Sequence, residues 1–191
     1  MEFDSVIDER KSVRSFKSKT PSWKLVIEAI DAARKAPFAD GRNHLKFIII
    51  EDQEKIDKIA ELAAQSWISS SKLLVIVCSD DTNLENMHGD RGRIYSRQQS
   101  GAAIENFLLK LVDLGLSGCW VGSYSDEMIK QMLKIPMHIQ IEAIIPVGYE
   151  AAKTKKSRKK EIEHNIFWES WDEKKRNSFM NKDVGEYTHI S

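Results

Sequence analysis

Two arginines and a serine near the amino terminus have the chemistry to bind a phosphate group. Arg10, Ser12 and Arg14 occupy alternate positions directly after a predicted first helix, and alternate side chains of an extended segment point to one side. A guanidinium group offers parallel N–H donors and keeps its charge at any working pH, which suits a dianionic phosphate. Arginines at this spacing are also common as solvated or ion-paired residues, so the cluster alone leaves both interpretations open.

Two further segments could contact the same phosphorylated ligand. The run KTKKSRKK, residues 153–160, places six cations in eight residues, a pattern of solvated loops and of some nucleic-acid patches. Gly118 and Gly122 enclose an apolar stretch where the backbone could approach a flat ligand, because glycine has no side chain. A planar cofactor that carries a phosphate would satisfy the two cationic groups and the glycine segment together.

The composition argues against several classes of protein. The 191 residues include 29 Lys plus Arg and 29 Asp plus Glu, so no net positive charge favours nucleic acid or an acidic membrane. No apolar run approaches the roughly 18 residues of a membrane helix, and the start MEFDSVIDERK lacks the apolar segment of a secretory signal. The five histidines lack metal-ligand spacing, and Cys78 and Cys119 suit a reducing compartment better than a disulfide framework. We therefore expect a soluble, cytoplasmic protein with no metal site.

Apolar periodicity predicts alternating helices and strands. Helical spacing of apolar residues predicts helices over 2–9, 21–36, 54–65, 98–116 and 126–133. Thr20 is expected to cap the second helix, with Pro21 in its first turn and Pro37 at its end. Short apolar runs predict strands over 47–50, 73–77, 119–121 and 139–147. This order favours an α/β or α+β domain of three layers, with the long helix over 98–116 at its centre.

The first cationic block belongs to a longer pattern. RKSVRSF, residues 10–16, resembles the Arg-x-Ser-x-(Arg/Lys)-x-Phe signature of the FMN-dependent nitroreductases, and the resemblance extends from about residue 1 to residue 168. The resemblance implies that Arg10, Lys11, Ser12 and Arg14 hold the phosphate and ribityl chain of FMN. It also makes Arg14 a candidate for stabilising negative charge on the reduced flavin.

Two later blocks are similar to the same family and occur in the same order. Residues 101–124 are similar to its central dimer helix and the glycine-rich strand that follows, with Ser117 at a common glycine position. The resemblance implies that Val121, Gly122 and Ser123 pass beside the isoalloxazine ring. IIPVGY, residues 144–149, is similar to the last core strand, after which Lys156 and Arg158 are implied as a second phosphate-binding pair.

One block departs from the family pattern. The family usually has Ala-Pro-Ser-x-x-Asn-x-Gln-Pro-Trp before its first strand, whereas this chain reads APFADGRNHLKF over residues 36–47. Pro37, Phe38 and Ala39 are still implied to cover the flavin from the other subunit. Phe38, Gly41, Asn43, His44 and Leu45 stand at the more characteristic positions, so the resemblance does not carry over the side-chain contacts to flavin and substrate near residues 41–44. The stretch over 80–97 is also short for the lid that longer members carry.

The resemblance implies an α+β, three-layer α-β-α fold with a central mixed sheet flanked by helices. It implies a single domain over 1–165, and an extension over 166–191 in which Trp168 and Trp171 anchor the chain on a partner subunit of a homodimer. Packing within the chain is the alternative for these tryptophans. Neither nucleic acid nor membrane is expected as a partner.

The implied activity is the ping-pong transfer of reducing equivalents from NADH or NADPH through FMN to a nitroaromatic, quinone or similar small acceptor, with no catalytic side chain because the flavin supplies the chemistry. Fold alone leaves alternatives open: a specialised dehydrogenase, dehalogenase or flavin-fragmenting enzyme, or a flavin-binding protein without turnover. A nucleic-acid role for residues 153–160 is disfavoured by the zero net charge and the lack of interleaved aromatic residues.

Overall fold

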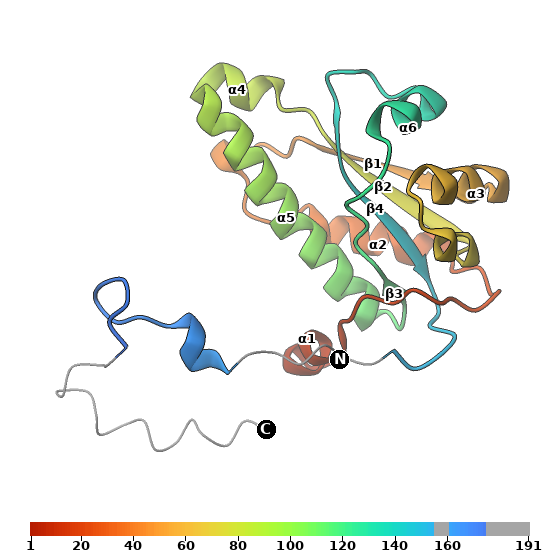
Figure 1. The fold of residues 1–191 in the computed structure, drawn as a ribbon, viewed down its shortest axis with the longest axis horizontal. Coiled ribbons are helices and arrows are strands. Elements are labelled where there is room, and N and C mark those ends of the chain that lie inside the picture. The colour runs from red at the N-terminus through yellow and green to blue at the C-terminus, as the bar shows by residue number, and fades with distance from the viewer. Residues whose placement is uncertain (155–160, 175–191) are drawn as a thin grey trace. The chain divides into compact units, whose positions relative to one another are not determined.

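The computed structural model describes residues 1–154 and 161–174. It divides the chain into two compact units, Met1–Thr154 and Lys155–Ser191, and the first unit carries the sheet and the long helices (Figure 1). Two residues expected to bind phosphate, Lys156 and Arg158, lie outside the described residues.

The first unit is built around a four-stranded sheet. Its strands are β1 (Leu45–Ile50), β2 (Leu73–Ser79), β3 (Ser117–Gly118) and β4 (Gln140–Gly148). They lie in the order β1-β2-β4-β3, and each neighbouring pair is antiparallel. The parallel component of the expected mixed sheet is a single bridge between Ser12 and Gly118.

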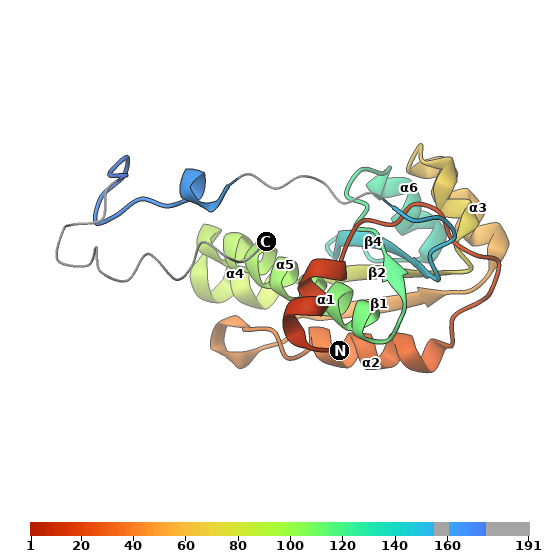
Figure 2. The ribbon, with the colours of Figure 1, turned by 90° about the horizontal axis from the view of Figure 1, so that it is seen from below.

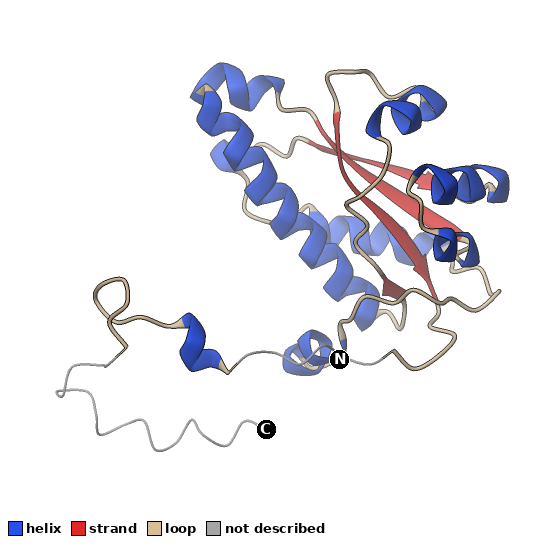
Figure 3. Cartoon of the chain, viewed as in Figure 1, coloured by secondary structure: helices blue, strands red, loops and turns tan. Residues whose placement is uncertain are grey.

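Helices cover both faces of this sheet and form the three layers that the sequence predicts (Figures 2 and 3). The helices on one face are α2 (Trp23–Ala33) and α5 (Asp90–Asp113); those on the other are α3 (Gln53–Leu62) and α6 (Asp126–Leu133). β2 is buried along its whole length, with alternate residues packed into the two cores. Burial on both faces explains why β2 is continuously apolar rather than alternating.

The remaining helices are short. They are α1 (Phe3–Glu9), α4 (Thr82–His88) and the 3-10 helices η1 (Ala39–Gly41), η2 (Ser66–Ser70) and η3 (Ile162–Asn165). Residues 126–133 form a helix as predicted, whereas α5 begins at Asp90 instead of Gln98. The stretch over 80–97 is therefore mostly helical, formed by α4 and the first turns of α5.

The predicted cap of the second helix is wrong by two residues. α2 begins at Trp23, and its cap is Ser22, whose Oγ accepts a hydrogen bond from the Lys24 amide at 3.3 Å. Ser22 therefore does what Thr20 was expected to do, because its side chain satisfies an amide that the first turn leaves unpaired.

The predicted strand over 119–121 does not form as a continuous strand. β3 ends at Gly118, and Val121 then makes an isolated antiparallel bridge with Ile144. In this register Cys119 lies opposite Pro146, which has no N–H to donate, so the ladder is interrupted between the two pairs. Trp120 is left 40% exposed rather than buried.

The described part of the second unit contains an aromatic contact of its own. The rings of Phe167 and Trp171 lie 4.8 Å apart between centroids, and the Lys174 Nζ lies 4.1 Å from the Phe167 ring centroid. Trp171 is nevertheless 82% exposed. The expectation that Trp168 and Trp171 pack on a partner subunit stays a prediction.

Candidate cofactor-binding site

An extended segment after α1 holds the first cationic block against the sheet. The Val13 amide donates to the Gly118 carbonyl at 3.1 Å, and the Val13 side chain is buried. Ser12 and Arg14, on either side of Val13, are exposed. Burial of Val13 between them directs Ser12 and Arg14 outward together, as their spacing predicts.

Phe16 fixes the end of this extended segment. It forms an antiparallel bridge with Glu150, and its ring packs on Gly148. A Cβ atom at Gly148 would lie 2.9 Å from the Phe16 ring, so only glycine leaves room for this contact. The last residue of the RKSVRSF block thus positions the donors that precede it.

Ser12 and Arg14 meet at the Cys119 thiol. Burial raises the pKa of Cys119, and the Arg14 charge and hydrogen bonds with Ser12 and Arg14 offset only part of that rise. The thiol therefore stays protonated at neutral pH and adds no negative charge to the cluster. Among the described residues, no ion pair includes Arg14; its guanidinium lies 6.0 Å from the Trp67 ring centroid.

The other two cations of the block have carboxylate partners. Arg10 Nε lies 3.2 Å from Glu105 of α5, and both side chains are partly exposed. Lys11 Nζ lies 2.9 Å from Glu150. Burial alone would raise the pKa of Glu150, but hydrogen bonds from Lys11 and Thr154 bring it below its ordinary value. Within the described residues, Arg14 is therefore the cation of this block whose charge is not paired with a carboxylate, so it can pair with a negatively charged ligand.

The segment that follows β3 leaves space beside its backbone. Val121 is buried against Ile144, whereas Gly122 and Ser123 are exposed. A Cβ atom placed on Gly122 would meet nothing within 4 Å. Gly118 forms the bridge to Ser12, and Gly122 follows only four residues later. The same short segment therefore contacts the Ser12–Arg14 donors at one end and offers open backbone at the other.

The donor set fits a phosphorylated planar ligand. A guanidinium without a carboxylate partner and a neighbouring hydroxyl are donors that a phosphate accepts. Open backbone at Gly122 leaves room for a flat ring to approach.

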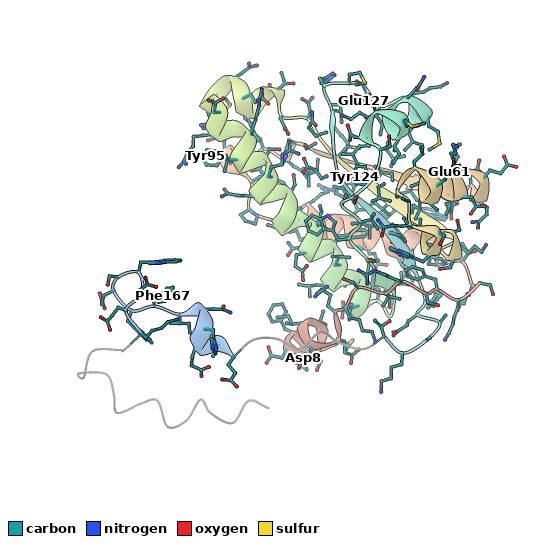
Figure 4. All side chains as sticks on the ribbon, viewed as in Figure 1. Asp8, Glu61, Tyr95, Tyr124, Glu127 and Phe167 are labelled. Atoms are coloured by element: carbon teal, nitrogen blue, oxygen red, sulfur yellow. The ribbon has the colours of Figure 1, made fainter. Side chains whose placement is uncertain are left out.

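Pro37, Phe38 and Ala39 lie elsewhere in the same chain. They line a pocket of about 350 Å³ together with four residues of α5, namely Tyr95, Gln98, Gln99 and Ala102. Figure 4 labels Tyr95 on this helix. The Ala39 amide donates to Gln99, whereas the Gly118 region packs on Leu108 and Leu111 of the same helix. At the rise of an α-helix these contacts are roughly 14 to 18 Å apart.

One chain therefore does not bring residues 37–39 to the Ser12–Arg14 cluster. This separation agrees with the expectation that the loop covers a flavin bound by another subunit, which stays a prediction.

Several residues beside the candidate site were not singled out from the sequence. Trp67 lies beside Arg14, and Glu105 and Glu150 hold Arg10 and Lys11. Each comes from an element distant in the sequence, and none belongs to a local motif. Cys119 was interpreted as a core residue; it is indeed buried, but its thiol also touches the cluster.

Two other features were searched for in the described part of the chain. No helix there is long and apolar enough to cross a membrane. In residues 1–154 and 161–174, no group of three or more His, Cys, Asp or Glu side chains could hold a metal ion.

Comparisons with known proteins agree on one family. The model of the nitroreductase family matches residues 7–89 and 73–149. A candidate NADH dehydrogenase/NAD(P)H nitroreductase of Methanothermobacter thermautotrophicus is 29% identical over 156 residues, covering 79% of this chain and 78% of that protein. The FMN reductase [NAD(P)H] of Bacillus subtilis is 22% identical over 165 residues, covering 78% and 66%.

A solved structure agrees with the sequence comparisons. The crystal structure of a candidate NADH dehydrogenase/NAD(P)H nitroreductase from Parabacteroides distasonis has a TM-score of 0.78 and 26% identity, covering 90% of this chain and 99% of that one. The family model spans both the RKSVRSF block and the IIPVGY block on which the candidate site is built. The chain belongs to the nitroreductase family.

Proposed function

We propose that this chain is an FMN-dependent oxidoreductase that takes reducing equivalents from NADH or NADPH and passes them to a nitroaromatic, a quinone or a similar small acceptor. The observation that carries the proposal is the bridge that fixes Ser12, and with it Arg14, at Gly118, four residues before the open backbone at Gly122. Family membership and the FMN reductase among the relatives support the choice of cofactor.

The residues of the site would divide the work of binding. Ser12 and Arg14 supply donors for the phosphate end of FMN, with Arg10 and Lys11 beside them and with Lys156 and Arg158 as further candidates. The Val121–Ser123 backbone offers the surface for the flavin ring, and residues 37–39 of a second subunit would cover it. FMN supplies the hydride and electron chemistry when bound.

Arg14 has an electrostatic role in this proposal. Its guanidinium lies in a site where the neighbouring thiol stays neutral and no carboxylate pairs with it in the described chain. A free positive charge of this kind favours a ligand that carries negative charge, whether on its phosphate or on its ring. No side chain of the site is needed as a general base, because the proposed chemistry belongs to the flavin.

The proposal includes a homodimer with two flavin sites and a cytoplasmic location. Two observations support the homodimer: residues 37–39 line a pocket remote from the Ser12–Arg14 cluster, and α1 exposes Phe3 and Ile7. Apolar side chains exposed on a helix are often covered by another subunit.

The direct test is anaerobic reduction of the flavin-loaded protein. We expect NADH or NADPH to bleach the flavin absorption, and menadione or nitrofurazone to restore it afterwards. Free FMN at the same concentration is the control for uncatalysed reduction. Protein that retains FMN but that neither nicotinamide reduces would contradict the proposal and indicate a flavin-binding protein without turnover.

A further inference from the structure

A chain of hydrogen bonds runs from the Pro37–Ala39 loop into the protein. The Ala39 amide donates to Gln99 Oε1 at 2.8 Å, and Gln99 Nε2 lies 2.9 Å from His44 Nδ1. On the other side of the ring, His44 Nε2 lies 2.9 Å from Ser96 Oγ, which in turn donates to Asp81. His44, Ser96, Gln99 and Asp81 are all buried, so these side chains depend on one another for partners.

The inner end of this chain is anchored by charge. Arg97 bridges Asp81 and Glu142, and the Ser79 hydroxyl lies within hydrogen-bond distance of both carboxylates. Glu142 is the extra residue of a bulge between β2 and β4, which lies where the register shifts beside Val77. Bulges redirect side chains, and here the carboxylate meets Arg97 of α5. Asp81 is therefore held as a fixed acceptor.

The donors and acceptors define the protonation state of His44. Gln99 accepts from Ala39 with its oxygen, so its NH2 group must face His44 Nδ1, which can then only accept. Ser96 gives its proton to Asp81, so its oxygen accepts from His44 Nε2–H. The chain thus requires neutral His44 with its proton on Nε2.

A second proton on His44 would break the chain at a defined place. Nδ1–H would face the Gln99 NH2 group, donor against donor. Rotation of the Gln99 amide would restore that contact, but would then turn the NH2 group toward the Ala39 amide. In either orientation of Gln99, one N–H group loses its acceptor: His44 Nδ1–H in the first, the Ala39 amide in the second. Losing the Ala39 hydrogen bond costs less, because the loop lies nearer to solvent than His44 does.

The charges around His44 oppose one another. Burial lowers the pKa of His44 and is the largest effect; Asp81 and Asp80 at the start of α4 act to raise it, whereas Arg97 of α5 acts to lower it. Phe38 contacts the ring edge-on at 6.0 Å between centroids and brings no charge. On the outer side of η1, His88 Nε2 lies 3.0 Å from Asp40 Oδ2.

We propose that neutral His44 is a positioning residue that holds the Pro37–Ala39 loop through Gln99, and that protonation of His44 releases this loop. The inference rests on the proposed function, because that function places the loop over the flavin. In the block that departs from the family pattern, His44 stands where the family usually has proline. The substitution therefore supplies a pH-sensitive support for the flavin cover.

The primary test measures hydrogen exchange of the Ala39 amide in the full chain, by NMR, as protection relative to an unstructured peptide. Between about pH 7.5 and about pH 5, the range over which histidines ordinarily change charge, we expect Ala39 protection to fall about tenfold, the value of one hydrogen bond. The fall should lie toward the acidic end, because burial lowers the pKa of His44. His44→Asn keeps an acceptor near the Nδ1 position and cannot titrate, so its Ala39 protection should stay level. His138→Asn, at an exposed histidine, is the matched control and should behave as the wild type.

Gln99→Leu provides a second variant in case His44→Asn does not fold. It leaves His44 in place but removes the link, so Ala39 protection should be low throughout and independent of pH. Unchanged protection of wild-type Ala39 across this range, an equal fall in His44→Asn, or wild-type behaviour in Gln99→Leu would each overturn the proposal.

Retention of FMN over the same range separates this inference from the proposed function. We expect the Kd for FMN to rise several-fold at the lower pH in the wild type and to change less in His44→Asn. If the protein binds no FMN at any pH, the proposed function fails, while Ala39 exchange still decides whether His44 holds the loop. If FMN binds and Ala39 is released without any change in Kd, the link between the loop and the flavin is overturned.

Discussion

At the scale of single residues, ion pairing separates the four donors of the RKSVRSF block. Glu105 and Glu150 engage Arg10 and Lys11, which leaves Arg14 beside Ser12 and a protonated Cys119. A charge already paired with a carboxylate must give up that partner before it can bind a phosphate at full strength. The resemblance assigned all four residues to the phosphate end of FMN without distinction, and the structure ranks them.

Replacement of Arg14 tests this ranking. Arg14→Ala should weaken FMN binding by roughly ten- to a hundredfold, because a hydrogen bond to a charged group contributes about 1.5–3 kcal/mol. Arg34→Ala is the matched control, since Arg34 is exposed and its ion pair, within the described residues, is with Asp31 of the helix that it follows. Fluorescence titration of FMN gives both Kd values. Equal Kd values for the two variants would remove Arg14 from the site.

The two cysteines should be unreactive in the folded chain. Burial raises the pKa of Cys78 to about 11 and also raises that of Cys119, so both are protonated thiols at about pH 8. A disulfide reagent such as DTNB should therefore react slowly with native protein and rapidly with two thiols per denatured chain. A fast reaction of one thiol in the native protein would show that Cys119 is accessible, contrary to its burial.

At the scale of elements, the packing of α4 on α5 depends on one close approach. A Cβ atom at Gly92, in the first turns of α5, would lie 2.2 Å from the Leu84 carbonyl oxygen of α4. Backbone atoms cannot move aside as a flexible side chain can. The close packing of α4 on α5 therefore requires glycine at position 92.

Paired glycine substitutions in α5 test this packing. Gly92→Ala should lower the free energy of unfolding by about 1–3 kcal/mol, because it forces the two helices apart. Gly101→Ala in the same helix meets its nearest atom, in Trp120, at 4.0 Å and should be neutral or stabilising by up to about 1 kcal/mol, because alanine favours a helix. Urea denaturation followed by circular dichroism measures both. A Gly92→Ala variant as stable as Gly101→Ala would contradict the observed packing.

Local sequence patterns predicted most elements of the first unit. Residues 126–133 form the expected helix, and the strands at 45–50 and 73–79 begin or end within two residues of expectation. The cap of α2 was displaced locally, from Thr20 to Ser22. Two other errors arose where distant residues decide. Pro146 interrupts the strand predicted at 119–121 from across the sheet, and the early start of α5 depends on contact with α4.

In the candidate site, too, local features could be predicted from the sequence and contacts between distant residues could not. The alternation of residues 10, 12 and 14 was visible in the sequence, because it needs only an extended backbone. The partners of Arg10 and Lys11 and the hydrogen bonds of His44 were not, since they join residues separated by dozens of positions. His44 was noticed only as a departure from the family pattern.

At the scale of the whole molecule, the proposed homodimer assigns a role to the extension over 166–191. Truncation after Ile166 removes Trp168 and Trp171, and we expect the dimer to dissociate at a higher protein concentration than the full chain does, because aromatic anchors contribute strongly at interfaces. Sedimentation velocity over a dilution series measures this change. A truncated chain with an unchanged, fully stable dimer would exclude a major role for the extension.

The central claim is that the Ser12–Arg14 cluster and the Gly122 backbone form an FMN site in this chain. The most direct measurement is the visible absorption spectrum of the purified protein after incubation with FMN and desalting. We expect a retained flavin spectrum at about one equivalent per chain, as two sites in a homodimer require. A desalted protein without flavin absorption would contradict the claim and would mean that the departures over residues 38–45 outweigh the matching blocks.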